Sequence, residues 1–556
     1  MSDSTSSTPS SGTSISSGSI DHKSDPTHFD VVVVGTGFSG LLCAAFLQEA
    51  DITDICIFEM TPSVGGVWSN GGVGAYPGAA CDVPAYTYLP FLDRTGFIPS
   101  KKYVSQSEIS SYAEMLTDYI GVRDKIHFSR KVTKLSYIGD SSGDVAKVWQ
   151  ITTENTATGE LADIVTCAHV VTANGPLSSP RLPEIPGMDK FKGESFHTAR
   201  WDKSASLKGK KVGVIGTGAS AAQVITAIVD DVESLHVFQR TATWCLPRND
   251  EPTPPEMIEQ FKAGGYSESL RRVDWKGEEP VDPDAAVAFS FDSLHDEVQN
   301  KAICDMIEVG LRSAVKDQEI ADKLTPDYPF FCKRALFIDD YYTTFNKPHV
   351  TLIDDNGGVV AVNETGLEIA RGETFDLDVI IYATGFDSNF IPFLIEGKNG
   401  ISLADKFGAN ADNNYQMVRP HSLWGIHVDE MPNFYMMIGP QSLNPVTNVT
   451  LLCEEQSKYI AALVKQMKAD KKSQVEPTKQ AVEAWTDLCE ASSAGKVWLR
   501  CNNWYMKSTK TDAAKGRERS SGMWMGNYAD YLKHVLGNEG GPKEKLLQFS
   551  SQGQSK

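Results

Sequence analysis

The stretch that decides the fold is FDVVVVGTGFSG, residues 29–40. Its apolar first half is typical of a strand buried on both faces of a parallel sheet. The second half has the spacing G-x-G-x-x-G, and residues 41–48 continue as a predicted helix. The glycines permit a tight turn and let a pyrophosphate approach the helix N-terminus, where free N–H groups attract an anion. We therefore expect a dinucleotide-binding βαβ unit, with candidate contacts from Gly35, Gly37, Phe38, Ser39 and Gly40.

An acidic residue closes the next predicted strand, Ile55–Phe58, at Glu59. It stands 24 residues after Gly35, which is the usual offset for a ribose-binding carboxylate. A carboxylate there accepts hydrogen bonds from ribose hydroxyls and repels a 2′-phosphate. The first site is therefore predicted to hold FAD or NAD and to exclude NADP.

The residues that follow favour FAD. Gly66, Val67 and Trp68 bring the backbone and an aromatic wall close to a flat ring, and Asp82 follows in a turn-rich segment. A flavin-linked disulfide reductase would carry a C-x-x-x-x-C pair here. Cys81 has no such partner, which argues against a redox-active disulfide beside the flavin.

A second unit begins at the predicted strand Lys211–Ile215 and continues as GTGASAA, residues 216–222. Alanine replaces the third glycine, a substitution that still permits close packing of helix on strand. The candidate contacts are Gly216, Thr217, Gly218, Ala219, Ser220, Ala221 and Gln223.

Arg240 and Thr241 follow the next predicted strand of this unit, His236–Phe238. Arg240 stands 24 residues after Gly216, at the offset where the first unit has Glu59. A guanidinium fork suits a 2′-phosphate, so this site is predicted to prefer NADPH. Two such units in one chain imply hydride transfer from NADPH to a flavin.

Composition limits the remaining possibilities. A net charge of −20 over 556 residues makes nucleic acid and anionic membranes poor partners, and the length suits two to four domains. No apolar stretch is long enough to span a membrane, no signal peptide is evident, and no metal-ligand spacing occurs. The ten cysteines, without a C-x-x-C pair, are predicted to be reduced thiols in a cytoplasmic protein.

FKGESFHTARWD, residues 191–202, lies between the two units and reads F-x-G-x-x-x-H-x-x-x-W-D. It resembles the fingerprint of the Baeyer–Villiger monooxygenases, which use FAD, NADPH and O₂ to insert one oxygen beside a ketone carbonyl. The related N- and S-oxygenating flavin monooxygenases usually have Tyr or Phe where this chain has Trp201. The resemblance runs from about Phe29 to Tyr531 and implies an ester or lactone product.

The resemblance also implies roles for particular residues. Arg334 would face the flavin and stabilise the peroxyflavin anion, Asp82 would orient Arg334, and Lys333 would help hold the 2′-phosphate. Trp504 would contact NADP from a mobile loop, and Tyr88, Val132 and Val449 would line the FAD site. Independently of the family, a cation about 4 Å from a peroxide favours its anion by roughly 4 kcal/mol at an effective dielectric near 20.

We expect an α/β fold with two Rossmann-like domains, both discontinuous, and a helical insertion. The predicted ranges are an FAD domain at 29–180 and 379–540, an NADP domain at 185–250 and 332–378, an insertion at 251–331, and tails at 1–28 and 541–556. The chain departs from the family in a longer Trp68–Tyr76 spacing and in the Met506–Lys510 segment.

Three other functions compete with ketone oxygenation. The nearest is an N- or S-oxygenating flavin monooxygenase, against which Trp201 and the Lys333-Arg334 pair argue. A reductase that passes electrons to a partner protein is disfavoured by the missing cysteine pairs, so no obligate protein partner is expected. A flavin-binding module without catalysis would not oxidise NADPH.

Overall fold

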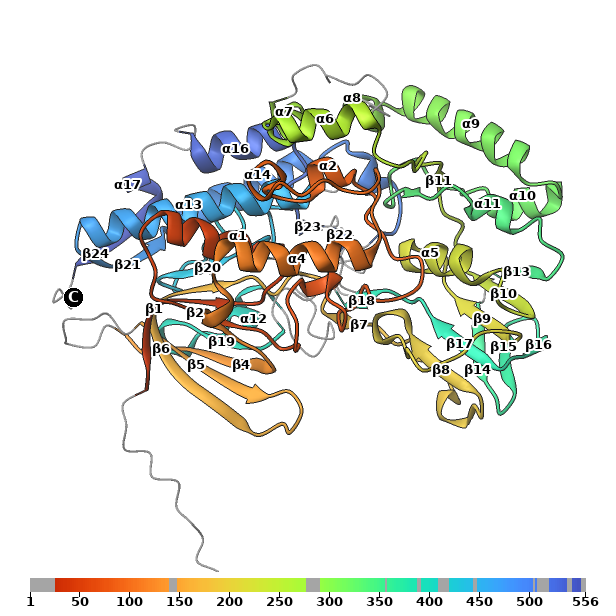
Figure 1. The fold of residues 1–556 in the computed structure, drawn as a ribbon, viewed down its shortest axis with the longest axis horizontal. Coiled ribbons are helices and arrows are strands. Elements are labelled where there is room, and N and C mark those ends of the chain that lie inside the picture. Colours follow the sequence, from red (N-terminus) through yellow and green to blue (C-terminus); the bar gives the residue numbers. More distant parts are fainter. Residues whose placement is uncertain are drawn as a thin grey trace, which may run out of the picture.

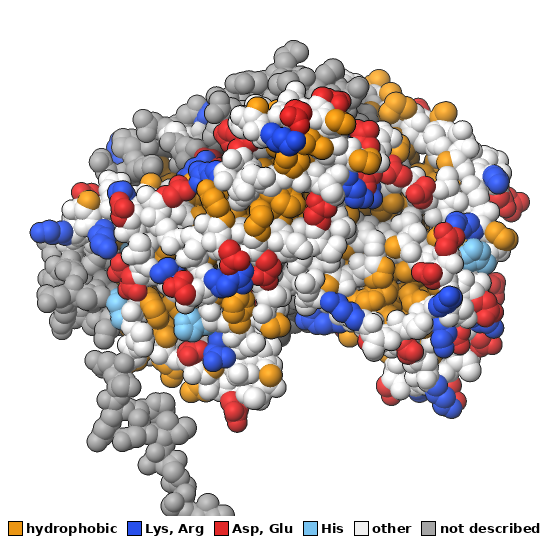
Figure 2. Space-filling model, viewed as in Figure 1, with side chains coloured by type: hydrophobic (Ala, Val, Ile, Leu, Met, Phe, Trp, Pro, Cys, Tyr) orange, Lys and Arg blue, Asp and Glu red, His pale blue; other side chains and the backbone are white. Residues whose placement is uncertain are grey.

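The computed structural model describes residues 26–139, 148–276, 291–355, 358–387, 392–408, 420–443, 448–503, 506–507, 520–537 and 543–551. Figure 1 shows two lobes, each built on its own sheet, beneath a continuous arc of helices. In the space-filling view, a notch at the lower edge separates the lobes (Figure 2). The two-domain α/β architecture predicted from the glycine-rich repeats is confirmed.

The larger lobe contains an eight-stranded sheet in the order β19-β4-β5-β6-β1-β2-β3, with β20 paired to β6. Strand β1 lies parallel to β2 and β6, whereas β4, β5 and β6 form an antiparallel meander. The strands are β1 His28–Val34, β2 Ile55–Phe58, β3 Ile126–His127, β4 Arg130–Tyr137, β5 Trp149–Asn155, β6 Leu161–Thr172, β19 Leu394–Glu396 and β20 Phe434–Met436.

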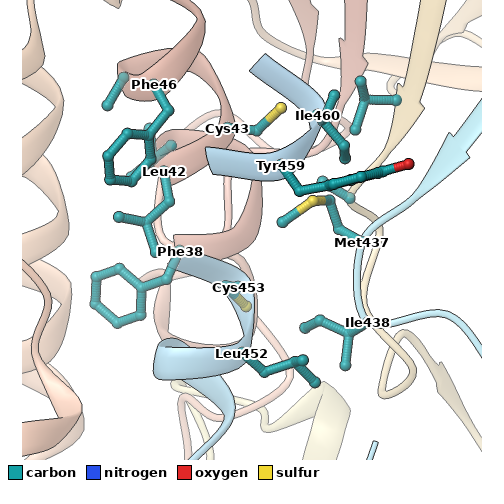
Figure 3. Close-up of a cluster of buried hydrophobic side chains, with 14 of the residues drawn as sticks. Phe38, Leu42, Cys43, Phe46, Met437, Ile438, Leu452, Cys453, Tyr459 and Ile460 are labelled. Carbon is teal, nitrogen blue, oxygen red and sulfur yellow. The ribbon is translucent and has the colours of Figure 1, made fainter. Parts of the chain in front are cut away.

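Helix α1 (Phe38–Glu49) joins β1 to β2 and packs along α13 (Val449–Ala469). Every residue from Phe38 to Leu47 is buried, which explains why the helix is apolar on all sides. In Figure 3, Leu452 and Ile460 of α13 lie beside Met437 and Ile438, while Phe38, Leu42 and Phe46 of α1 point to the opposite side. Around them lie α2 Ala85–Tyr88, α3 Leu92–Thr95, α4 Gln106–Ile120, α14 Lys479–Ser493, α16 Tyr528–Leu536 and α17 Lys543–Leu546.

The smaller lobe contains a five-stranded, fully parallel sheet in the order β13-β10-β9-β17-β8. Helix α5 (Ala219–Ile228) follows β9, and a three-stranded antiparallel sheet, β14-β15-β16, lies beside the lobe. The strands are β8 Glu194–His197, β9 Lys211–Ile215, β10 Ser234–Gln239, β13 Val350–Asp354, β14 Val359–Val362, β15 Gly366–Ile369, β16 Thr374–Asp376 and β17 Val379–Tyr382.

Three predicted boundaries are wrong. Strand β17 pairs with β9 and β8, so residue 379 does not open the second FAD segment. An apolar strand fits either sheet, and only its pairing decides between them. The predicted C-terminal tail contains β24 (Leu547–Ser551), which pairs with β21 (Lys472–Pro477). Of the predicted N-terminal tail, residues 1–25 lie outside the described residues, and His28 already belongs to β1.

The described residues of the insertion, 251–276 and 291–331, are mostly helical, as predicted, and they touch both lobes. Helix α7 packs on α2 and α3 of the larger lobe, while α9 packs on α11 (Tyr341–Thr344) of the smaller one. Arg271 of α7 also pairs with Glu454 of α13 at 2.5 Å. The insertion helices are α6 Pro255–Ala263, α7 Tyr266–Lys276, α8 Phe291–His295, α9 Glu297–Ala314 and α10 Gln318–Leu324.

The prediction that all ten cysteines are reduced is wrong. Cys332 and Cys501 form a disulfide across a sequence separation of 169 residues. No local spacing can indicate such a pair, because the fold alone brings the two segments together. The other eight cysteines are free thiols, of which all but Cys304 are buried. Among the described helices, none is long and apolar enough to cross a membrane.

Candidate active site

The first glycine-rich turn leaves no space for side chains. Gly35 has φ +106° and lies against the carbonyl of Ala173, and a Cβ at Gly40 would fall 2.0 Å from the Gly35 oxygen. The N-cap of α1 is Gly37, with no side-chain cap and no acid in the first turn. Helices α9, α13, α14 and α16, in contrast, have side-chain caps. The N-terminal N–H groups of α1 are therefore available to an anion.

A second loop closes over this turn. The Gly65 N–H donates to the Thr36 carbonyl at 3.0 Å, and a Cβ on Gly66 would lie 2.8 Å from the Gly37 Cα. The additional residues between Trp68 and Tyr76 fold back on the same loop, since the Gly74 N–H donates to the Val67 carbonyl at 2.9 Å. The two glycine loops thus form one narrow cradle at the start of α1.

Glu59 is buried at the end of β2 and already accepts four hydrogen bonds. The N–H and hydroxyl of Thr36 donate to one carboxylate oxygen at 3.0 and 2.7 Å, and those of Thr61 donate to the other, both at 2.8 Å. Thr36 and Thr61 were not singled out from the sequence, because a threonine in a turn carries no distinctive pattern. Their four bonds fix the carboxylate at the edge of the cradle.

The aromatic residues near the cradle form a connected group. The Trp68 Nε1–H donates to the Tyr88 hydroxyl at 2.7 Å, and the Tyr88 ring packs edge-on against Phe38 at 5.9 Å. Burial raises the pKa of Tyr88 well above its ordinary value, so the hydroxyl stays protonated. Trp68 is thereby held in place by a residue of α2.

Three predicted FAD contacts have side chains directed elsewhere. Phe38 is buried in the α1–α13 core, Val132 is buried beneath the larger sheet, and Ser39 lies 3.3 Å from the sulfur of Cys453. Only the backbone of these residues remains for a cofactor. Val449 is the first residue of α13, whose N-cap Asn448 also donates to the Thr87 carbonyl at 3.0 Å.

The second glycine-rich turn repeats the geometry of the first. Gly216 has φ +118° and lies against the Ala383 carbonyl, as Gly35 lies against Ala173. The N-cap of α5 is Gly218, again without a side-chain cap or an acid in the first turn. Thr217 donates to the Thr241 carbonyl at 2.7 Å, which joins this turn to the loop after β10.

Gln223 connects the two lobes. Its Oε1 accepts from the Tyr76 hydroxyl at 2.8 Å, and its Nε2 donates to the Ala80 carbonyl at 2.8 Å. Gly78, with φ +78°, passes so close that a Cβ would lie 2.4 Å from the Gln223 carbonyl oxygen. The Gln223 side chain, predicted as a cofactor contact, thus bonds residues of the other lobe. Like Thr36 and Thr61, Tyr76 is not identified as a site residue by the sequence alone.

Arg240 and Lys333 line one pocket of about 780 Å³ at the end of β10. The Lys333 Nζ lies 4.6 Å from the centre of the Tyr328 ring. Burial lowers the pKa of Lys333, the nearby Arg240 lowers it further, and Asp327 opposes the shift. The two predicted phosphate-binding cations therefore face one space, and an anion in that space would relieve their repulsion.

Arg334 faces away from this pocket and binds Asp82 of the larger lobe. The Arg334 Nη2 lies 2.8 Å from both carboxylate oxygens, and Nε lies 3.0 Å from Oδ2. Both side chains remain partly accessible, with 40% of the arginine and 25% of the aspartate exposed. Asp82 thus holds the guanidinium through two of its nitrogens, which is the pairing that the family resemblance implies.

The stretch at residues 191–202 lies at the joint between the lobes. His197 ends β8 at the edge of the smaller sheet, and its ring packs edge-on against Phe386 at 6.0 Å. Burial lowers the pKa of His197, so the ring is neutral near pH 7. Trp201 packs on Phe196 at 4.9 Å, and Lys203 reaches the Asn70 carbonyl of the larger lobe at 2.5 Å. Trp504 lies outside the described residues.

Together these features define a class: an oxidoreductase with one dinucleotide site in each lobe and an arginine that is held by a carboxylate of the larger lobe. The two uncapped helices and the glycine cradle fit the pyrophosphates of two dinucleotides.

Comparisons with known proteins agree with this class. A family model described as flavin-binding monooxygenase-like matches residues 29–264. A 2-oxo-Delta(3)-4,5,5-trimethylcyclopentenylacetyl-CoA monooxygenase of Pseudomonas putida is 30% identical, over 86% of this chain and 91% of its own. A Baeyer–Villiger monooxygenase of Streptomyces coelicolor is 32% identical, over 89% and 83%. A solved structure of OTEMO in complex with FAD and NADP matches with a TM-score of 0.82 at 27% identity, covering 95% of this chain and 100% of that one.

The chain belongs to the Baeyer–Villiger monooxygenase family. The family resemblance carried by residues 191–202 is thereby confirmed.

Proposed function

We propose that this chain is an NADPH-dependent Baeyer–Villiger monooxygenase that holds FAD and converts a ketone to an ester or lactone. Bound FAD, once reduced by NADPH, supplies the activation of O₂. The proposal rests on family membership and on the match to a solved FAD and NADP complex. The two glycine-rich turns provide places for both cofactors within the chain.

The observation that carries the chemistry is the fixed guanidinium of Arg334. A side chain that keeps its charge favours an oxygen anion over its protonated form, and only the anion attacks a carbonyl as a nucleophile. Asp82 holds the guanidinium through Nε and Nη2, so its orientation does not have to be established during the reaction. An N- or S-oxygenating enzyme, in contrast, uses the protonated oxidant and needs no such cation.

The other residues bind and orient. The cradle of Gly37 and Gly66 receives the pyrophosphate of FAD, with Glu59 toward its ribose. Arg240 and Lys333 receive the 2′-phosphate of NADPH in the pocket after β10. Trp504, which lies outside the described residues, is assigned the NADPH contact that the family resemblance implies.

We also propose that the enzyme works in the cytoplasm without an obligate protein partner. The eight free thiols and the acidic surface support this setting. The ketone itself is a small molecule, and the insertion over the joint, which contacts both lobes, is placed to shape its access.

The test uses the purified holoenzyme with NADPH, O₂ and a panel of cyclic, linear and aromatic ketones plus one aryl methyl sulfide. We expect an ester or lactone heavier than its ketone by one oxygen atom, identified by mass spectrometry. Sulfoxide formation with no ester across the panel would show that the enzyme is an S-oxygenating monooxygenase. Electron transfer to an added acceptor without any oxygenated product would indicate a reductase.

A further inference from the structure

We propose that Arg500 is a third cation of the pocket for the phosphate end of NADPH, and that the Cys332–Cys501 disulfide is a thiol-sensitive tether that holds it there. The proposal rests on the proposed function, which assigns this pocket to NADPH. It adds a specificity residue and a redox dependence of nucleotide affinity that the two glycine-rich motifs do not imply.

The cations Arg240, Lys333 and Arg500 reach the pocket from three separate chain segments. Arg240 comes from the loop after β10, Lys333 from the segment after α10, and Arg500 from the 3₁₀ turn Val497–Arg500. Lys323 also lines the pocket, and three acidic residues line it as well: Asp322, Asp327 and Asp354. Asp322 pairs with Arg312 at 2.8 Å, and Asp354 accepts from Gln239 at 3.2 Å. In a chain of net charge −20, this pocket presents an excess of cations.

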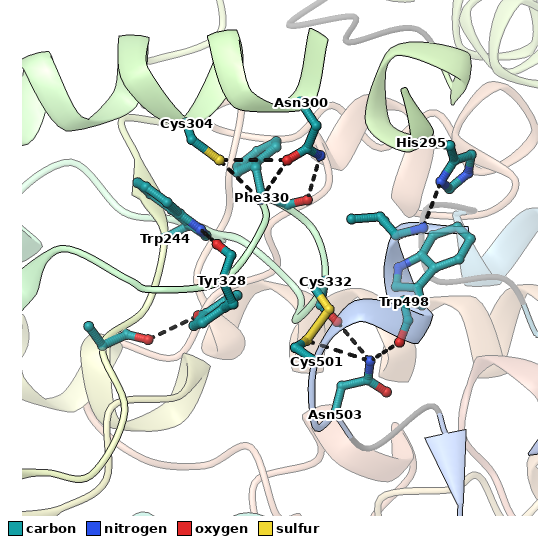
Figure 4. The surroundings of a disulfide bond; sticks show 12 residues. Trp244, His295, Asn300, Cys304, Tyr328, Phe330, Cys332, Trp498, Cys501 and Asn503 are labelled. Carbon is teal, nitrogen blue, oxygen red and sulfur yellow. Dashed lines mark hydrogen bonds between the residues drawn. A yellow bond between two sulfur atoms is a disulfide. The ribbon is translucent and has the colours of Figure 1, made fainter. Parts of the chain in front are cut away.

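The disulfide joins two of these segments directly. Figure 4 shows the bond between Cys332 and Cys501. In the sequence, Cys332 immediately precedes Lys333, and Cys501 immediately follows Arg500. The two cysteine Cα atoms lie 6.0 Å apart, so the Cα atoms of Lys333 and Arg500 are at most about 14 Å apart. Side chains of this length from both residues can reach one phosphate. Without the covalent link, the two cations belong to segments 167 residues apart in the chain.

Weaker contacts hold the same turn to the insertion. Arg500 Nη2 donates to the His295 carbonyl at 3.0 Å and lies 3.4 Å from Glu297. The Val497 N–H donates to His295 Nδ1 at 3.3 Å, and Asn503 donates to the Cys332 carbonyl at 2.9 Å. These contacts survive reduction, so cleavage of the disulfide loosens the turn and does not unfold it.

Electrostatics explains why a covalent tether is useful here. Lys333 already has its pKa lowered by burial and by the nearby Arg240, so another cation is repelled until an anion arrives. A disulfide holds the third cation in place regardless of that repulsion. A bound phosphate then gains three charge-assisted partners without having to gather them.

The tether can be opened from the pocket side. Cys501 is partly exposed and lines the pocket, whereas Cys332 is fully buried. A dithiol would transfer two electrons and two protons to the bridge, which gives two cysteine thiols and the cyclic disulfide of the reagent. Disulfides in reducing compartments commonly serve as redox sensors, which suits this exchange. NADP⁺ in the pocket should protect the bridge.

The first experiment compares Arg500→Ala with Lys479→Ala, which removes an exposed cation that does not line the pocket. Anaerobic flavin reduction is followed at varied NADPH and NADH. We expect Arg500→Ala to raise the half-saturating NADPH concentration about tenfold, with the NADH value and both limiting rates within about twofold. Arg500→Lys should restore most of the NADPH affinity. A half-saturating NADPH concentration that is unchanged in Arg500→Ala would overturn the proposal.

The second experiment treats the oxidised holoenzyme with dithiothreitol, removes the reagent, and repeats the NADPH titration. We expect a rise of about fivefold in the half-saturating concentration, reversed by reoxidation and prevented by NADP⁺ during treatment. Cys304→Ser, which replaces a thiol in the same cluster, should keep this response, and Cys501→Ser should show the raised value without treatment. Peptide mapping that finds no 332–501 bridge in the oxidised enzyme, or a bridge whose reduction leaves NADPH affinity unchanged, would refute the tether.

Arg240→Ala separates this inference from the proposed function. If Arg240→Ala leaves the preference for NADPH over NADH intact, the assignment of the pocket to NADPH is wrong. If Arg240→Ala abolishes the preference for NADPH over NADH and Arg500→Ala leaves that preference unchanged, only the role of Arg500 is wrong.

Discussion

Arg334 and Asp82 form a two-nitrogen ion pair across the lobes, with Nη2 at 2.8 Å from both carboxylate oxygens and Nε at 3.0 Å from one. In the sequence, Arg334 comes directly after Lys333, which lines the pocket. Asp82 comes two residues after Ala80, whose carbonyl accepts a hydrogen bond from Gln223. One ion pair thus sets the guanidinium relative to both nucleotide sites.

Loss of one partner of this pair should uncouple reduction from oxygenation. The Asp82→Asn substitution keeps the shape of the side chain but removes the negative charge of the carboxylate. The amide nitrogen that replaces one oxygen is a donor, so it repels the N–H groups of the Arg334 guanidinium. We expect ester formation to fall about tenfold or more while NADPH reduces the flavin at a near-normal rate. The ratio of ester to NADPH consumed measures this, and an unchanged ratio would show that Asp82 does not position Arg334.

The two glycine loops give a test of the FAD cradle. Gly66→Ala introduces a Cβ 2.8 Å from the Gly37 Cα at a residue with φ +58°, so both space and backbone oppose it. We expect the purified variant to contain little FAD and to have a lower melting temperature. Gly71→Ala is the matched control, because nothing lies within 4 Å of its Cβ position. Equal flavin content in the two variants would contradict the assignment.

NADPH affinity should fall at alkaline pH. The pKa of Lys333 is lowered from the ordinary lysine value of 10.5 in the free enzyme, so its charge is lost at a lower pH than that of an exposed lysine. The half-saturating NADPH concentration should therefore rise as the solution becomes alkaline, beginning below pH 10.5, while that of NADH stays flat. Lys333→Arg should remove this rise, because arginine keeps its charge throughout. An alkaline rise of the same size in Lys333→Arg would assign it to another group.

Folding stability should depend on His169 of β6. Burial lowers its pKa from 6.5 to about 4, with Asp30 partly opposing the shift, so the folded protein favours the neutral ring. This contribution is complete above the unfolded pKa and is lost as pH falls from 6.5 toward about 4. At pH 5 the loss is about 2 kcal/mol. Urea unfolding of wild type and His169→Gln at pH 7.5 and 5 measures it, and an equal acid destabilisation of both would exclude His169.

Much of the fold could be predicted from the sequence, because the decisive signals are local. A strand, a glycine turn and a helix are contiguous in each unit, and Glu59 and Arg240 follow at the same offset. The partners of Glu59 could not be predicted, since Thr36 and Thr61 carry no pattern of their own. Gln223 stands in the nucleotide-binding motif, yet its amide joins the lobes.

Long-range pairing explains the remaining errors. Strand β17 has the apolar sequence VIIY, which fits either sheet, and its membership depends on β8 and β9. Cys332 and Cys501 are adjacent only because the chain returns past the smaller lobe after the α13–α14 region. The sequence shows each of these segments, and the tertiary fold decides which of them meet.

The central claim is that Arg334 directs activated oxygen onto a ketone, and Arg334→Ala tests it most directly. In a single turnover the reduced holoenzyme is mixed with O₂ and a ketone that the wild type converts. We predict normal flavin reduction by NADPH and an ester yield at least about 100-fold below wild type, with hydrogen peroxide formed instead. Ester formation by Arg334→Ala at a rate near that of the wild type would contradict the account.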